Sequence, residues 1–336
     1  MRLGVYTAIL HDRPLPDALA VIRDLGLDGA EINSGGFLPP VHLPIDDLLA
    51  GRLDPAGYLA AFDAAGVALT GLNCNGNPLH PDPRIGPVHA EDLRRTIRAA
   101  GRLGVRRVVA MSGLPAAQRG GTVPGWFPMP FESTYSDARD AQWEEVGVPF
   151  WREIDALARE HDVRVGIEMH QYNLVFNPGT LERLVERTGA THLGAELDPS
   201  HLFWQGIDPV AAVEHLGELV VHAAAKDTRI NPAAAVYGVL DDRHRRVTDD
   251  PVRLGGDATL NAWPENGGWD FVALGRGHDT AFWTRFLAAL AAVDPDMAVN
   301  IEHEDVELGR IEGLRAAADV LTAAGRSVPH GTPPAA

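Results

Sequence analysis

Three short segments in the second half of the chain combine carboxylates with histidine at the end of apolar runs. They cover residues 165–170 (Val-Gly-Ile-Glu-Met-His), 194–201 (Gly-Ala-Glu-Leu-Asp-Pro-Ser-His) and 299–305 (Val-Asn-Ile-Glu-His-Glu-Asp). Short apolar runs that end in charge are typical of buried parallel strands whose last residues reach solvent. Carboxylate oxygens and imidazole nitrogens gathered from several strand ends suit Mn²⁺, Mg²⁺, Co²⁺ or Zn²⁺. The pattern therefore predicts a metal enzyme whose site is assembled across neighbouring strands.

The elements that must position these residues alternate regularly along the chain. Eight strand-like runs are predicted at residues 3–9, 29–33, 68–73, 107–111, 164–168, 193–198, 220–225 and 298–302. Amphipathic segments between them predict helices at 16–25, 55–65, 90–103, 149–160, 180–188, 209–216 and 280–292. Because βα alternation implies a parallel sheet, eight repeats over this length favour the α/β class and a closed (β/α)₈ TIM barrel.

We predict a single catalytic domain over residues 1–326 and a flexible tail, rich in proline and small residues, over 327–336. Two segments are longer than ordinary connections, 112–148 after the fourth strand and 228–280 after the seventh. Loops of this length in a compact domain are usually lids or binding loops. Tryptophans in or beside them either pin the loops to the barrel or form a wall for a sugar ring; they are Trp126, Trp143, Trp263, Trp269 and Trp283.

Composition excludes several classes of protein. The 336 residues are 45% hydrophobic and 22% charged, which is enough apolar material for a full core. A net charge of −17 argues against a nucleic-acid partner and against an anionic membrane surface, because both need a basic footprint. The one cysteine, Cys74, fits a reducing cytoplasm without a disulfide framework, and no run approaches the roughly 20 apolar residues of a membrane span.

Candidate site residues follow the predicted strand ends. Glu168, Asp198 and Glu302 end strands five, six and eight, so they converge on one side of the barrel mouth. Near other strand ends lie four histidines that could bind sugar hydroxyls, namely His80, His170, His201 and His278. Lys226 is a candidate cation facing an oxyanion, although pairing with the adjacent Asp227, itself a candidate substrate ligand, is slightly favoured.

These motifs together resemble the sugar phosphate isomerase/epimerase superfamily, the xylose-isomerase-like TIM barrels that include ketose 3-epimerases. The resemblance spans nearly the whole chain. It rests on residues 71–80 (Gly-Leu-Asn-Cys-Asn-Gly-Asn-Pro-Leu-His), 112–115 (Ser-Gly-Leu-Pro), 198–201 (Asp-Pro-Ser-His), 225–228 (Ala-Lys-Asp-Thr) and 301–305 (Ile-Glu-His-Glu-Asp). The set in this order is fairly specific for the superfamily but does not identify a substrate.

The resemblance implies one divalent metal ion, with Mn²⁺ expected and Mg²⁺, Co²⁺ or Zn²⁺ as alternatives. Relatives supply Glu, Asp, His and Glu from strands five to eight, and Glu168, Asp198 and Glu302 match three of these places. The fourth departs from the family pattern, because Ala224 stands at the histidine position. His222 faces the same side but lies roughly 6.6 Å deeper.

Either His222 reaches upward, or His201 or His170 swings in, or water completes the shell; His201 is slightly favoured. The resemblance further implies that Glu168 and Glu302 act as acid and base, with His170 and Lys226 as further catalytic candidates. The expected reaction is sugar isomerisation or epimerisation, by proton abstraction α to a carbonyl through an enediolate that the metal stabilises.

The alternative that shares this first step is β-elimination, as in 3-keto-glycoside lyases and C-glycoside deglycosidases, which resemble the same superfamily. An endonuclease-IV-like enzyme would want more histidine ligands and a basic face, and a non-catalytic sugar-binding barrel would have lost its metal. The expected partner is a small sugar or keto-glycoside, not nucleic acid or membrane. A homo-oligomer or a small second subunit is left open.

Overall fold

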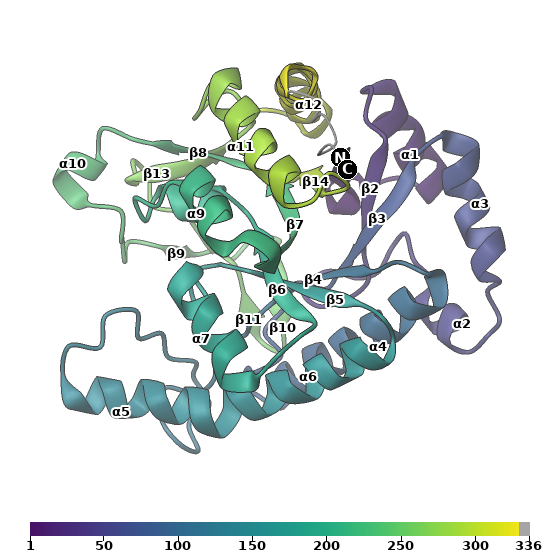
Figure 1. Ribbon diagram of the computed structural model, residues 1–336. Helices are drawn as coiled ribbons and strands as arrows, with labels where there is room; N and C mark the ends of the chain where they lie inside the picture. The colour runs from purple at the N-terminus through teal and green to yellow at the C-terminus, as the bar shows by residue number, and fades with distance from the viewer. Residues whose placement is uncertain (329–336) are drawn as a thin grey trace, which may run out of the picture.

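The computed structural model describes residues 1–328, and the rest of the predicted tail, 329–336, lies outside the described residues. Eight parallel strands close into a barrel in the order β1-β14-β7-β6-β5-β4-β3-β2 (Figure 1), which confirms the predicted fold class. The barrel strands are β1 (Arg2–Tyr6), β2 (Gly29–Asn33), β3 (Ala68–Asn73), β4 (Arg107–Met111), β5 (Arg164–Glu168), β6 (Leu193–Leu197), β7 (Val220–Ala225) and β14 (Ala298–Ile301). Each matches a predicted strand to within a few residues.

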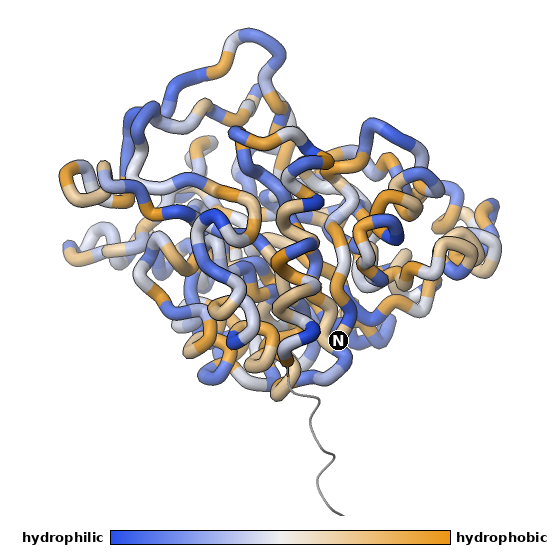
Figure 2. Tube along the Cα trace, turned by 90° about the horizontal axis from the view of Figure 1, so that it is seen from above, coloured by the Kyte–Doolittle hydropathy of each residue, from blue (hydrophilic) through white to orange (hydrophobic). Residues whose placement is uncertain are grey.

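Helices surround the barrel and alternate apolar and polar residues along their length (Figure 2). The outer helices are α1 (Leu15–Asp24), α3 (Pro55–Ala65), α4 (Gly86–Leu103), α6 (Val148–Glu160), α7 (Pro178–Thr188), α9 (Pro209–Leu216), α11 (Thr280–Val293) and α12 (Arg310–Ser327). Helix α12 follows the last barrel strand and was not among the predicted helices. Its apolar side packs against α11, which completes the ring of helices.

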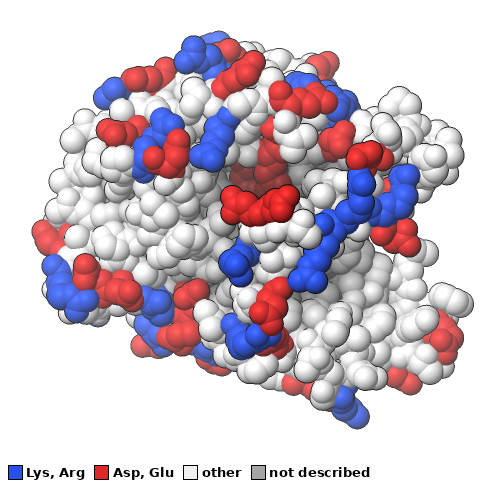
Figure 3. All heavy atoms as spheres, turned by 180° about the vertical axis from the view of Figure 1, so that it is seen from behind, with Lys and Arg blue, Asp and Glu red and all other residues white. Residues whose placement is uncertain are grey.

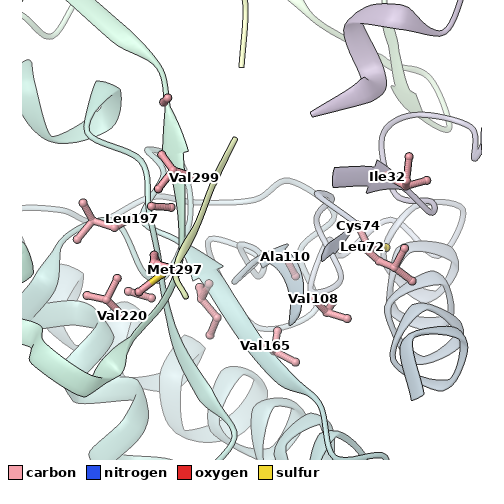
Figure 4. Close-up of a cluster of buried hydrophobic side chains, with 14 of the residues drawn as sticks. Ile32, Leu72, Cys74, Val108, Ala110, Val165, Leu197, Val220, Met297 and Val299 are labelled. Atoms are coloured by element: carbon pink, nitrogen blue, oxygen red, sulfur yellow. The ribbon is translucent and has the colours of Figure 1, made fainter. Parts of the chain in front are cut away.

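The main hydrophobic core lies between the strands and the helices. Outward-facing strand residues fill it, including Ile32, Leu72, Val165 and Val299, all fully buried (Figure 4). The interior of the barrel is different, because small residues there make room for polar ones. A Cβ built on Gly4 would lie 2.4 Å from Oδ1 of Asn300, so only glycine fits beside that amide. The barrel therefore has an apolar outer face, which packs against the helices, and a polar interior.

The two long loops carry structure of their own, contrary to the irregular loops that the sequence suggested. The first contains helix α5 (Ser133–Ala141) and one π-helical segment, η2 (Gln142–Gly147). The second contains β8 (Asp227–Ile230), which pairs antiparallel with β13 (Trp269–Val272), and it also contains helix α10 (Ala234–Tyr237). Two further two-stranded sheets lie between them: β9 (Arg245–Arg246) pairs with β12 (Asn261–Ala262), and β10 (Arg253–Gly255) pairs with β11 (Ala258–Thr259).

The second loop crosses the barrel to the side opposite its own strand. It leaves from β7, yet its β10–β11 hairpin reaches the start of α4, which follows β3. A Cβ built on Gly256 would lie 3.2 Å from Cγ1 of the buried Ile85. Arg84 pairs with Asp257 at 2.7 Å in the same contact. The loop thus covers the open face of the barrel, and residues 228–280 are called the lid loop below.

Acidic and basic side chains are interspersed over the surface, and acidic ones lie in and beside a hollow on the face drawn in Figure 3. Within residues 1–328, no helix combines the length and the apolar character that a membrane span requires.

Candidate metal centre

Strand β5 and the turn after β6 bring a glutamate, an aspartate and a histidine together. Glu168 is the last residue of β5, and Asp198 follows β6 directly. Helix α8 (Ser200–Phe203) begins at once, so that His201 turns back over the barrel. Its Nε2 lies 2.9 Å from Oε1 of Glu168 and 3.2 Å from Oδ2 of Asp198. All three side chains are buried to 3% exposure or less.

His170 completes this group from the loop that follows β5. Ligand atoms of Glu168, His170 and His201 all lie within 4.8 Å of one another. The two imidazole rings lie 4.1 Å apart, centroid to centroid. The structure therefore brings together one carboxylate and two imidazoles, with Asp198 beside them, which is a donor set that suits a divalent ion.

Gln171 fixes both histidine rings, and sequence reasoning missed it. Its backbone carbonyl accepts a hydrogen bond from Nδ1 of His170 at 2.7 Å, and its side-chain Oε1 accepts one from Nδ1 of His201 at 2.9 Å. Each bond places the ring proton on Nδ1 and leaves the Nε2 lone pair free, as in many metal-ligating histidines. Asn75, on the loop after β3, likewise donates to Oε2 of Glu168. The signal for Gln171 was its place directly after His170.

The buried atoms at the centre of the group lack proper hydrogen bonds. His201 Nε2 and Asp198 Oδ2 are buried with no hydrogen-bond partner among the described residues, although they face each other. When Nδ1 carries the ring proton, Nε2 and the two carboxylates present only lone pairs to one another. Unsatisfied buried polar atoms are costly. A cation between them would satisfy all three, so these residues fit a metal ion.

The pKa values of the group also indicate that the two carboxylates favour a positive charge between them. Burial opposes charging of His201, but Asp198 and Glu168 raise its pKa to about 9. Burial also opposes the charged form of Glu168, yet His201, His170 and Lys226 hold its pKa at about 2. Burial and the neighbouring His201 lower the pKa of His170 to about 4. Without a metal, Glu168 is thus ionised, His170 neutral and His201 protonated at neutral pH, and a divalent ion would have to displace the Nε2 proton of His201.

Lys226 and Glu302 form a second group beside the first. Lys226 is the single residue between β7 and β8. Its Nζ donates to Glu302 at 3.3 Å and to Glu304 at 2.8 Å. It lies 4.0 Å from Oδ2 of Asp198 and 4.4 Å from the centroid of the Phe271 ring. The expected pairing of Lys226 with Asp227 was wrong, because Asp227 is occupied by other donors. Burial raises the pKa of Glu302 well above its usual value, against the opposing effect of Lys226.

His222 lies deeper in the barrel, where it belongs to a polar layer. Its Nε2 is 2.6 Å from Oε2 of Glu31, and Asn300 donates to the same oxygen at 2.9 Å. Asn73 donates to the other oxygen of Glu31 at 2.8 Å. His222 does not reach upward past Ala224, and the described structure places His201 and His170, not His222, beside Glu168.

Glu196 and Tyr6 also face the interior, and neither was named from the sequence. Glu196 is buried, and burial followed by repulsion from Glu168, Asp198, Glu302 and Glu31 raises its pKa well above the usual value. Tyr6 ends β1, and its hydroxyl donates to Asn33 at 3.0 Å. Glu196 was open to prediction, because it lies two residues before Asp198 and shares its face of the strand.

Three predicted substrate ligands lie apart from this centre. Asp227 is fully buried and accepts hydrogen bonds from the ring of His278 and from the backbone N–H groups of Thr228, Gly275, Gly277 and His278. The His278 ring stacks on Phe203 at 3.7 Å. His80 lies before α4, where its Nδ1 accepts the N–H of Asp82. Asp227 and His278 thus hold the lid loop, and of the predicted substrate ligands only His170 and His201 lie at the centre.

The family model described as xylose isomerase-like TIM barrel matches residues 19–324, and the chain belongs to this family. It is 34% identical to the Bacillus subtilis (strain 168) protein YfiH, described as uncharacterized, over 325 residues, which are 96% of this chain and 98% of YfiH.

Among solved structures, the fold resembles the probable 3-DHS dehydratase AsbF from Bacillus anthracis, with a TM-score of 0.61, 16% identity and coverage of 96% and 99% of the two chains. It also resembles a D-tagatose 3-epimerase-like protein, with a TM-score of 0.60, 17% identity and coverage of 98% and 100%. At these identities the two structures share the fold alone.

Proposed function

We propose that the chain is a divalent-metal-dependent sugar isomerase or epimerase that removes a proton next to a carbonyl and returns it. The observation that carries this proposal is the buried group of Glu168, His170 and His201, with ligand atoms within 4.8 Å of one another and Asp198 at their side. The family and an epimerase-like structural relative favour the same class of reaction.

A divalent ion held by Glu168, His170, His201 and Asp198 supplies Lewis acidity toward the carbonyl and hydroxyl oxygens of the sugar. Mn²⁺ is our expectation, and Zn²⁺ suits two imidazoles equally well. Glu302, outside the group of closest ligand atoms, takes the proton from the carbon next to the carbonyl. In isomerisation it delivers this proton to the former carbonyl carbon; in epimerisation Glu168 is the candidate acid that protonates the original carbon from the opposite face. Lys226 holds the Glu302 carboxylate in place and contributes positive charge near the developing oxyanion.

β-Elimination remains the second candidate, and one feature favours it. A cavity of about 580 Å³ is lined by aromatic residues and by Gln171, the residue that holds the His201 ring, and it offers room beyond a single sugar ring. In this reaction Glu302 removes the same proton. The electron pair left on carbon then forms a double bond and expels the substituent one carbon further on.

Proton NMR in D₂O tests the proposal directly, with metal-supplemented protein and a panel of free aldoses, ketoses and 3-keto-glycosides. Deuterium in a recovered or isomerised sugar, abolished by Glu302→Gln, is the expected result. Release of the substituent with an unsaturated sugar product would replace isomerisation by elimination. Absence of both exchange and elimination with every sugar, in protein shown to contain metal, would contradict the proposal.

A further inference from the structure

The lid loop and the loops after β4, β5 and β6 enclose a cleft beside the candidate metal centre. Its volume is about 580 Å³, and residues from all four loops line it. The aromatic residues that line the cleft are Trp126, Tyr172, Trp204, Tyr237, Trp263 and Trp269. Ligand sites of this size are commonly apolar with a few placed polar groups.

The cleft adjoins the metal centre, and two side chains lie between them. Gln171 lines the cleft and also accepts the Nδ1 hydrogen bond of His201. The Phe271 ring lies 5.4 Å from the His201 ring on one side and 5.1 Å from the Trp269 ring on the other, centroid to centroid. The cleft and the metal centre are therefore neighbours, one aromatic ring apart.

The cleft has aromatic walls on both sides. Trp126 contacts Tyr172 at 5.1 Å on one side, and Trp204 stacks on Trp269 at 5.7 Å with an angle of 9° between the rings on the other. Trp263 stands edge-on to Trp269 and remains 42% exposed. Tyr172 is 55% exposed and holds a left-handed backbone, φ 59°, which is strained for a bulky residue. The exposed side chains of Trp263 and Tyr172 can therefore stack on the apolar C–H face of a sugar ring.

Polar groups form the outer edge of the cleft. Asp241, Asp242, Arg243 and His244 follow one another along the lid loop, and all four line it. Arg243 pairs with Asp241 at 2.6 Å and lies 4.4 Å from the Tyr237 ring centroid. Carboxylates, a guanidinium and an imidazole supply donors and acceptors of both kinds, which ring hydroxyls use and a plain aryl group does not.

We propose that this cleft binds the second sugar ring of a glycoside whose first ring lies at the metal centre. The substrate is then a disaccharide or a longer glycoside rather than a free monosaccharide. This inference rests on the proposed function for the position of the first ring. The cleft itself is defined by its lining residues and does not depend on that function.

Quenching of tryptophan fluorescence tests this, because four tryptophans line the cleft. Glucose, cellobiose, maltose and phenyl β-glucoside are titrated into the full chain, with and without Mn²⁺. We expect at least one disaccharide to bind about tenfold more tightly than glucose. Trp263→Ala should remove that difference and leave metal content unchanged. Phe131→Ala, which removes an exposed aromatic outside the cleft, should leave the difference intact.

Equal affinity for glucose and both disaccharides, or no binding of any, would overturn the inference. Tighter binding of the phenyl glucoside than of either disaccharide would overturn the assignment of a second sugar and identify an aryl group as the occupant. Disaccharide binding without deuterium exchange in any sugar would contradict the proposed function and leave the cleft standing. Deuterium exchange in free sugars without preferential disaccharide binding would support the proposed function and contradict the assignment of the cleft.

Discussion

Of the three histidines that were candidates for the fourth ligand place, His201 and His222 lie in the most different environments, while His170 lies beside His201. His201 faces Glu168 and Asp198 with its Nε2 free of hydrogen bonds, while Gln171 holds its Nδ1. His222 is turned toward Glu31, one layer deeper. Ala224 offers no donor at the usual ligand position, and we propose that His201, from helix α8 after β6, takes this role.

Substitution of each histidine by asparagine separates these roles. We expect His201→Asn to lower metal affinity at least tenfold, because it removes a donor from the centre. His222→Asn should retain one metal per chain but lose about 1–3 kcal/mol of stability, because the buried Glu31 oxygen loses a partner. Equilibrium dialysis with Mn²⁺ and urea denaturation measure the two effects. Loss of metal from His222→Asn with retention in His201→Asn would reverse the assignment.

At the scale of single residues, the sequence was informative where chemistry coincided with a strand end. Glu168, Asp198 and Glu302 could be placed because parallel strands end at one face of a barrel. The positions of Gln171 and Asn75 depend on how loops turn over that face, and no periodicity records this. Asp227 shows that the same pattern can mislead, because its carboxylate at a strand end accepts hydrogen bonds from backbone N–H groups and has a structural role.

At the scale of elements, the barrel strands were predictable and the loops were not. Strands such as β5 and β6 are short and mainly apolar, since helices cover one face and the barrel interior lies on the other, and Glu168 and Glu196 are their inward-facing exceptions. The lid loop consists of two- to four-residue strands and a short helix, which are too short for a periodic signal. Its path across the barrel depends on contacts with α4, which is distant in sequence.

The contact between the lid and α4 predicts a local effect of Ile85→Ala. The β10–β11 hairpin rests on this side chain, so its removal should free the lid and speed proteolytic cleavage within residues 241–268 severalfold. Arg84→Ala is the matched control. It removes an ion pair with Asp257 that is largely exposed and worth about 0–1 kcal/mol, so it should change cleavage little. Equal cleavage in Ile85→Ala and the parent would show that the hairpin is not held there.

At the scale of the whole molecule, the carboxylates inside the barrel lead us to expect that a bound metal stabilises the fold. Glu31, Glu168, Glu196, Asp198 and Glu302 all converge on one interior, where only Lys226 and the histidines oppose them. A divalent ion that binds the folded state alone contributes about 2.7 kcal/mol at one hundred times its dissociation constant. The proposed metal site therefore predicts that folding and metal binding are coupled.

Metal removal should lower the melting temperature by about 5 °C, which follows from that free energy in a chain of this size. Differential scanning calorimetry after chelation and dialysis, and again after Mn²⁺ or Zn²⁺ is restored, measures the change. Glu168→Gln is the control and should show a much smaller shift on restoring metal. The same large shift in Glu168→Gln as in the parent would place the ion elsewhere.

The most direct test of the account is anomalous diffraction from crystals grown with Mn²⁺. We predict one peak per chain, in contact with Glu168, His170 and His201 and beside Asp198. A peak at Glu302 and Glu304 instead, or at Glu31 and His222, would contradict the proposed centre. Absence of any peak in crystals of protein saturated with Mn²⁺ would contradict the metal enzyme altogether.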